Sequence, residues 1–124
     1  MKALFAFCFL SLLATARSTP VEAQVVAWRD TTEADLGDIL HLQPATHDFY
    51  FTNTSTDTLR IDNVRPSCGC TSPEWAAAAI PPGGEGSIRI TYDARDVGYF
   101  RKKIKVYFSR QRKAELLFIS GFVE

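Results

Sequence analysis

The chain has 124 residues, of which 46% are hydrophobic, and its 14 basic and 14 acidic side chains cancel to a formal net charge of zero. This balance gives no general reason to expect nucleic-acid binding, which usually needs a basic surface. The length gives room for one domain with one modest hydrophobic core and not for two.

The N-terminus has the features of an export signal. Met1 and Lys2 form a short positive region, and an apolar run follows over 3–14. The run is too short to span a bilayer but is typical of the core of a signal peptide. Small residues allow cleavage after Ala16 or after Ala23, and we favour Ala23.

This pattern predicts a signal peptide over 1–23 and a single domain over 24–124. The domain is then secreted or periplasmic, with no membrane span in the mature chain. The alternative is that the apolar run is an uncleaved anchor or a first core strand. Cys8 lies within the run and would be removed with the signal, so Cys68 and Cys70 are the cysteines expected to remain.

Apolar residues in the predicted domain alternate with a period of two, as in half-buried strands. Short segments with this pattern are separated by turn residues: 25–28, 36–40, 47–52, 59–62, 87–93, 100–108 and 115–123. The inward-facing side chains would include Phe49, Phe51, Leu59, Ile61, Ile88, Ile90 and Tyr92. Helical spacing is limited to a possible single turn over 75–79. The sequence therefore predicts an all-β fold, an immunoglobulin-like Greek-key β-sandwich of about seven strands.

The last predicted strand has apolar side chains on both faces. One set would face the core: Leu117, Ile119 and Val123. The other set would lie on the opposite face: Leu116, Phe118 and Phe122. Exposed apolar groups can form a patch for a partner or a neighbouring domain. The alternative is that a loop or the opening strand covers them.

Basic residues gather in the last third of the chain: Arg95, Arg101, Lys102, Lys103, Lys105, Arg110, Arg112 and Lys113. The simplest interpretation is that they line solvated strand faces and the tip of a hairpin.

The turn-forming stretch around Cys68-Gly69-Cys70 is where chemistry is most expected. With one residue between the cysteines, their α-carbons can come within disulfide range, and Gly69 permits the unusual backbone of so small a ring. Three interpretations stay open. Thiols or a local disulfide could pin the loop, a strained disulfide could be redox-active, or two thiolates could hold copper(I). A structural zinc site is not expected, because it needs four ligands.

Templates for catalysis do not fit the sequence. It has no glycine-flanked nucleophilic serine, no phosphate-binding glycine loop and no paired histidines on a helix. Trp75 is interpreted as a core residue or a lid over the cysteine loop. We therefore expect a protein that is not an enzyme and needs no cofactor.

Several motifs in the predicted domain are specific enough to compare with a family. They are Phe49-Tyr50-Phe51-Thr52-Asn53, Leu59-Arg60-Ile61-Asp62-Asn63-Val64, Ser67-Cys68-Gly69-Cys70-Thr71-Ser72-Pro73-Glu74-Trp75, Ile80-Pro81-Pro82-Gly83, Gly98-Tyr99-Phe100 and Ile104-Lys105-Val106. Together they resemble the bacterial Domain of Unknown Function 1573 family from about Leu36 to Val123. The SCGCT core is the most specific part of the match.

The resemblance implies an exported immunoglobulin-like sandwich, similar to the domains of abnormal-spindle and hydin proteins, with no established catalytic activity. Two positions depart from the family pattern. Ser55 stands where a glycine is common, and the hairpin tip at 110–113 lacks glycine and asparagine. Both departures put the geometry of a turn in doubt.

These observations predict a non-catalytic interaction or structural module with an unknown protein partner. The first candidate surface is the end of the sandwich with Cys68, Gly69 and Cys70, to which we add Trp75. Second candidates are the basic hairpin and the face with Leu116, Phe118 and Phe122. The alternative is a redox-active or copper-binding protein that uses Cys68 and Cys70. Addition of a partner's strand to a sheet edge is a third possibility.

Overall fold

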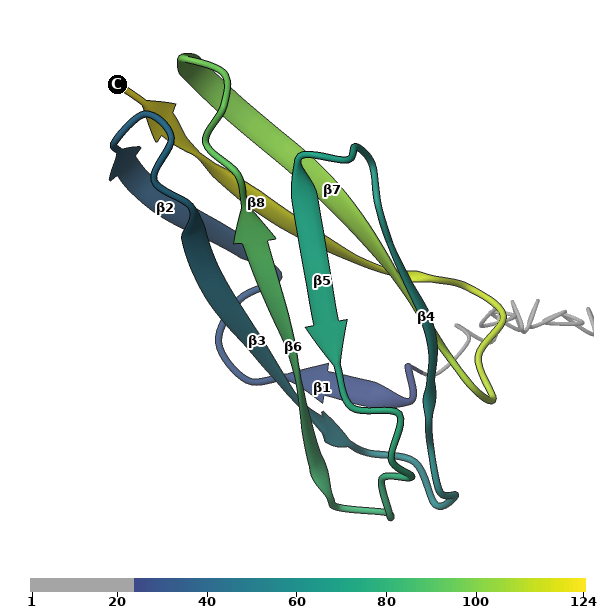
Figure 1. Cartoon of the computed structure of the whole chain (residues 1–124). Coiled ribbons are helices and arrows are strands. Elements are labelled where there is room, and N and C mark those ends of the chain that lie inside the picture. Colours follow the sequence, from purple (N-terminus) through teal and green to yellow (C-terminus); the bar gives the residue numbers. More distant parts are fainter. Residues whose placement is uncertain (1–23) are drawn as a thin grey trace, which may run out of the picture.

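The computed structural model describes residues 24–124, and the predicted signal peptide over 1–23 lies outside these residues. Eight strands follow one another along the chain (Figure 1): β1 Val26–Trp28, β2 Glu33–Ile39, β3 Ala45–Asn53, β4 Ile61–Pro66, β5 Thr71–Trp75, β6 Glu85–Tyr92, β7 Gly98–Phe108 and β8 Glu115–Val123. Within the described residues there is no helix that is long and apolar enough to cross a membrane.

The strands form two sheets of four, with orders β1-β3-β6-β5 and β2-β8-β7-β4. All neighbours are antiparallel except β2 and β8, which run parallel. The predicted all-β, immunoglobulin-like sandwich is therefore confirmed, with eight strands in place of about seven. The additional strand is β5, whose sequence Thr-Ser-Pro-Glu-Trp does not alternate and contains a proline.

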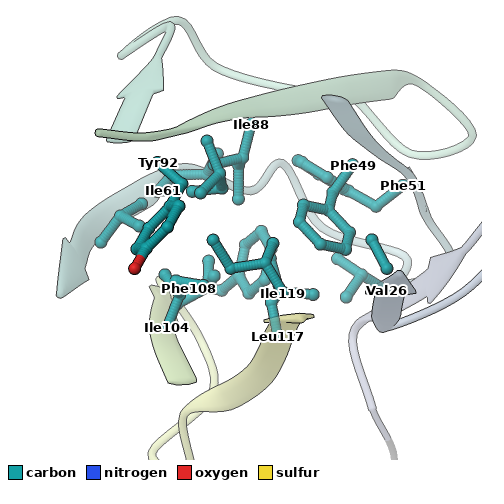
Figure 2. Close-up of a cluster of buried hydrophobic side chains, with 14 of the residues drawn as sticks. Val26, Phe49, Phe51, Ile61, Ile88, Tyr92, Ile104, Phe108, Leu117 and Ile119 are labelled. Atoms are coloured by element: carbon teal, nitrogen blue, oxygen red, sulfur yellow. The ribbon is translucent and has the colours of Figure 1, made fainter. Parts of the chain in front are cut away.

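The inward faces of both sheets meet in one hydrophobic core (Figure 2). All the side chains predicted to face inward are buried: Phe49, Phe51, Leu59, Ile61, Ile88, Ile90, Tyr92, Leu117, Ile119 and Val123. Aromatic rings join the two layers, because Phe51 of β3 and Phe108 of β7 lie edge to face with centroids 5.0 Å apart. The alternation that predicted the strands is thus the pattern that fills the core.

Two local details differ from the sequence pattern. The strand predicted from Leu59 begins at Ile61, and Leu59 instead forms an isolated bridge with Ile80 through two hydrogen bonds of 2.9 and 2.7 Å. The possible helical turn over 75–79 does not form, and those residues lead from β5 into the bridge at Ile80. The bridge between Leu59 and Ile80 joins two segments that are separated in the sequence. Local sequence patterns do not encode such a pairing.

The two departures from the family pattern are accommodated in different ways. The hydroxyl of Ser55 donates to Asn53 Oδ1 at 2.7 Å, so a side-chain hydrogen bond stabilises the turn after β3. At the tip of the hairpin between β7 and β8, Arg110 has a φ of 68°. This is the left-handed conformation that usually favours glycine.

Candidate interaction surface

The cysteine loop connects β4 to β5 at the end of the sandwich that also carries the connection from β6 to β7 (Figure 1). Backbone hydrogen bonds attach it to both sheets: Ser67 N donates to Lys103 O at 2.9 Å, and Asp93 N donates to Cys70 O at 2.9 Å. The α-carbons of Cys68 and Cys70 are 5.3 Å apart and their sulfur atoms are adjacent. That α-carbon separation is within the disulfide range, and the disulfide itself stays a prediction.

The two sulfur atoms face Thr71, the first residue of β5. Thr71 is buried, and its Oγ1 lies 3.9 Å from the Cys68 sulfur and 3.7 Å from the Cys70 sulfur. Cys70 also packs against the hydrophobic core, whereas Gly69 is exposed at the outside of the loop. This arrangement fits a loop pinned against the sandwich.

The copper alternative receives no support from the geometry. Over residues 24–124 there is no group of three or more His, Cys, Asp or Glu side chains placed to hold a metal ion. His41 and His47 have other neighbours: the His41 ring is hydrogen-bonded to Arg95 O, and the His47 ring lies 4.6 Å from that of Phe49.

Trp75 does not lie over the cysteine loop. It is the last residue of β5 and pairs with Ile88, whereas Thr71 at the start of the strand pairs with Tyr92. Its side chain is half-buried and packs against the core. The residues predicted as one surface at the cysteine end are therefore split, with Cys68, Gly69 and Cys70 together and Trp75 at the other end of β5.

The second predicted surface is on the outer side of the other sheet. Leu116 and Phe122 of β8 are 42% and 46% exposed, and Tyr99 of β7, which pairs with Phe122, is 71% exposed. Within residues 24–124 no loop buries Leu116 or Phe122, and the opening strand β1 belongs to the opposite sheet. Phe118 is covered by a side chain: the guanidinium of Arg101 lies 4.1 Å from its ring centroid.

The basic residues of the last third do not form a single cluster. Arg110, Arg112 and Lys113 belong to the hairpin after β7, as expected from the sequence. Lys103 and Lys105 lie on the outer side of β7, directly opposite Phe118 and Leu116 of β8.

A hollow of about 290 Å³ opens beside these lysines, on the outer side of β4 and β7. Its lining is Arg65, Pro66, Ser67, Lys103, Lys105 and Tyr107. The guanidinium of Arg65 is 5.9 Å from the Tyr107 ring centroid. Sequence analysis missed this hollow, although the alternation of Arg101, Lys103 and Lys105 along one strand was a signal that they share a face.

In the part of the chain that the structure describes, the three cations of the hollow have no acidic partner, which is also true of Arg60, Lys102, Arg112 and Lys113. Within residues 24–124, ion pairs involve Arg29, Arg89, Arg95, Arg101 and Arg110, but not Arg65, Lys103 or Lys105. On the outer side of the opposite sheet, for example, the hydrogen bond from Arg89 lowers the pKa of Asp48. We call the exposed Tyr99, Leu116 and Phe122, together with Arg65, Lys103 and Lys105, the β7–β8 face.

The sequence matches a family described as "Protein of unknown function (DUF1573)" over residues 27–123. The chain belongs to the DUF1573 family. The resemblance predicted from the sequence motifs is therefore confirmed over nearly the whole described domain. No curated protein matches the sequence.

Solved structures with the same fold come from distant proteins. A protein of unknown function from Porphyromonas gingivalis W83 is 16% identical with a TM-score of 0.66, and the match covers 79% of this chain and 46% of that one. The ASH/PapD-like domain 7 of human CEP192 is 12% identical with a TM-score of 0.70, and the match covers 93% of this chain and 95% of that domain. The VesB protease of Vibrio cholerae is 15% identical with a TM-score of 0.62, covering 81% and 32%.

At these identities the likeness shows the fold alone. The chain spans less than half of the Porphyromonas protein and about a third of the protease. It spans nearly all of the human domain, which supports a sandwich of the immunoglobulin-like and PapD-like kind.

Proposed function

We propose that this DUF1573 chain is an exported, non-catalytic interaction module that binds a protein partner through the β7–β8 face. The observation that carries the proposal is that exposed apolar side chains and unpaired cations share one side of one sheet, where Leu116 lies directly opposite Lys105. Apolar and aromatic anchors supply most of the affinity of an interface, and charges around them determine register and association rate.

The chemistry of the face selects the kind of partner. Arg65, Lys103 and Lys105 surround the hollow without an acidic partner in the described chain, so an acidic side chain could enter it and form charge-assisted hydrogen bonds. Leu116 and Phe122 are on the adjacent strand β8 and offer contact to an apolar side chain. A partner segment that combines acidic and apolar residues matches both parts.

Export and the absence of catalysis are also part of the proposal. The signal-like N-terminus supports export, and the lack of any recognisable catalytic motif supports a binding role. The likeness to the Vibrio cholerae protease VesB covers about a third of that chain and gives no argument for proteolysis here.

Site-specific photo-crosslinking in the exporting host tests the proposal. A photoreactive phenylalanine analogue is placed at Phe122 or, as a matched control, at Tyr50, which is 39% exposed on the opposite sheet. We expect a discrete cross-linked partner from Phe122 and none from Tyr50. The double substitution Lys103→Glu and Lys105→Glu should remove the adduct, because it places acids where acids are expected to bind.

Mass spectrometry of the adduct should then identify a partner peptide with acidic residues next to apolar ones. Equal labelling from Tyr50, or labelling that persists after the charge reversal, would contradict the proposal. The double substitution Cys68→Ser and Cys70→Ser should leave the adduct intact. Its loss would instead indicate that the cysteine loop is the functional site.

A further inference from the structure

Glu115 has a buried carboxylate at the start of β8. The residue is only 8% exposed, and one of its oxygens, Oε2, accepts a hydrogen bond from Gln24 Nε2 at 3.3 Å. The other oxygen, Oε1, is buried and receives no hydrogen bond from the described chain. A buried carboxylate oxygen without a donor is unfavourable, because it has lost its hydration without compensation.

The first residues of the described chain are held next to this carboxylate. Val25 N donates to Gln111 Oε1 at 3.1 Å, and Thr54 N donates to Val25 O at 3.0 Å. The side-chain nitrogen of Gln111 donates to Lys113 O at 2.7 Å, and Gln111 makes no hydrogen bond to Glu115. The residue whose side chain contacts Glu115 is Gln24.

The favoured cleavage site of the predicted signal peptide is the peptide bond between Ala23 and Gln24. Hydrolysis by a signal peptidase adds one water across that bond. Ala23 leaves with a carboxylate, and the backbone nitrogen of Gln24 becomes an α-ammonium with three N–H donors and a positive charge at neutral pH. A neutral amide nitrogen with one N–H is converted into a cation on the residue that touches Glu115.

We propose that signal cleavage after Ala23 creates an α-ammonium on Gln24 that pairs with Glu115 and fixes the mature N-terminus at the base of the β7–β8 hairpin. The buried Oε1 then has a charged donor, which is the partner that a buried carboxylate requires. The uncleaved precursor lacks this pair, so the domain becomes more stable after export than before it. This inference rests on the proposed export and not on the proposed partner.

A double-mutant cycle between the N-terminus and Glu115 tests the inference. One form begins at Gln24, and a second carries two extra alanines before Gln24, so that its backbone nitrogen stays an amide. Both are made with Glu115 and with Glu115→Gln. The extension should lower the Tm of the Glu115 protein by roughly 4–8 °C, the shift typical of one lost interaction in a domain of this size. It should have little effect in the Glu115→Gln protein, which has no charge to pair.

Two further measurements separate this pair from a general effect of the extension. The variant Gln24→Ala keeps the α-ammonium and removes the side-chain amide, so its Tm should fall by less than that of the extended form. The intact mass of the protein exported by its host should correspond to a chain that begins at Gln24.

Three results would overturn the inference. An equal Tm shift in the Glu115 and Glu115→Gln backgrounds would show that the ammonium does not act on Glu115. A mass that begins at Arg17 would move the cleavage to Ala16. A mass from Gln24 with loss of ammonia would show that the N-terminal glutamine has cyclised and carries no ammonium.

Discussion

Tyr92 illustrates how burial changes a single side chain. It is one of the largest fully buried residues, and its ring stacks on Phe100 with centroids 3.9 Å apart and an interplanar angle of 16°. Figure 2 shows the ring within the core cluster and the hydroxyl oxygen at its margin. Burial raises the pKa of Tyr92, and the negative charges of Asp93 and Asp96 add to the effect.

This shift predicts a contribution of Tyr92 to alkaline unfolding. Because its folded pKa lies above the unfolded value of about 10, the unfolded chain loses the phenolic proton first. The contribution of Tyr92 to the free energy of unfolding is therefore fully present below about pH 10 and is lost as the pH rises through the folded pKa. The variant Tyr92→Phe should lose less stability above about pH 10, as measured by urea midpoints against pH. Parallel curves for the two proteins would contradict this.

At the residue scale, the alternation of apolar residues predicts which side chains are buried. It does not predict which other side chains they contact. Alternation placed Phe49, Ile88 and Tyr92 in the core, because the period of a strand is a local property. The hydrogen bond between Gln24 and Glu115 could not be predicted, since the two residues are far apart in the sequence and only the fold brings them together.

The contact between β2 and β8 depends on two glycines. β2 has a bulge between Asp35 and Asp38, and Gly37 within it has a φ of 69°. A β-carbon at Gly121 of β8 would lie 2.8 Å from the backbone oxygen of Gly37 and 3.0 Å from the Phe100 ring. The close approach of β2 to β8 at the bulge therefore requires glycine at 121.

The substitution Gly121→Ala should destabilise the domain by about 1–3 kcal/mol, because backbone must move to make room for the methyl group. Gly69→Ala is the matched control: nothing lies within 4 Å of its added β-carbon. We expect that control to change the free energy of unfolding by less than about 0.5 kcal/mol. Urea denaturation of both variants measures the difference, and equal midpoints would be inconsistent with the packing described.

At the element scale, the alternation of apolar residues predicts seven of the strands but not β5. The missed strand has Pro73 in its middle and no alternation, and it forms because β6 offers it a partner. The hollow between β4 and β7 was missed for a similar reason. Arg65 lies opposite Lys105 only through the pairing of two strands that are far apart in the sequence.

At the scale of the whole molecule, Phe108 connects the two sheets. It is fully buried on β7, and its ring contacts those of Phe51 at 5.0 Å and Trp28 at 6.2 Å between centroids. Both partners belong to the opposite sheet. Removal of this ring would leave a cavity between the sheets and would eliminate both of these aromatic contacts.

The substitution Phe108→Ala should reduce the free energy of unfolding by about 3–5 kcal/mol. Because the free energy of unfolding of a domain of this kind is only about 5–15 kcal/mol, the variant should be close to unfolding at ordinary temperature. Tyr99→Ala on the same strand, at a position that is 71% exposed, should have little effect. Thermal denaturation followed by circular dichroism distinguishes the two, and a small effect of Phe108→Ala would show that the core can collapse around the gap.

The fold class and the family were both predictable from the sequence, since they follow from the period of two and from motifs that keep their spacing. The surface was predictable only in parts. Leu116 and Phe122 were expected to be exposed, but the position of Leu116 opposite Lys105 and of Phe122 opposite Tyr99 comes from the register of β7 on β8.

The two sheets have four outer strands, and each has a feature that hinders pairing with another chain. β1 has 3 residues, β4 ends in Pro66 and β5 contains Pro73. β2 is longer, but it has the bulge at Gly37 and the acidic side chains of Glu33, Asp35 and Asp38. Two copies that approached through β2 would bring like charges together. These features of the outer strands hinder the edge-to-edge association of copies that an exposed sheet edge otherwise favours.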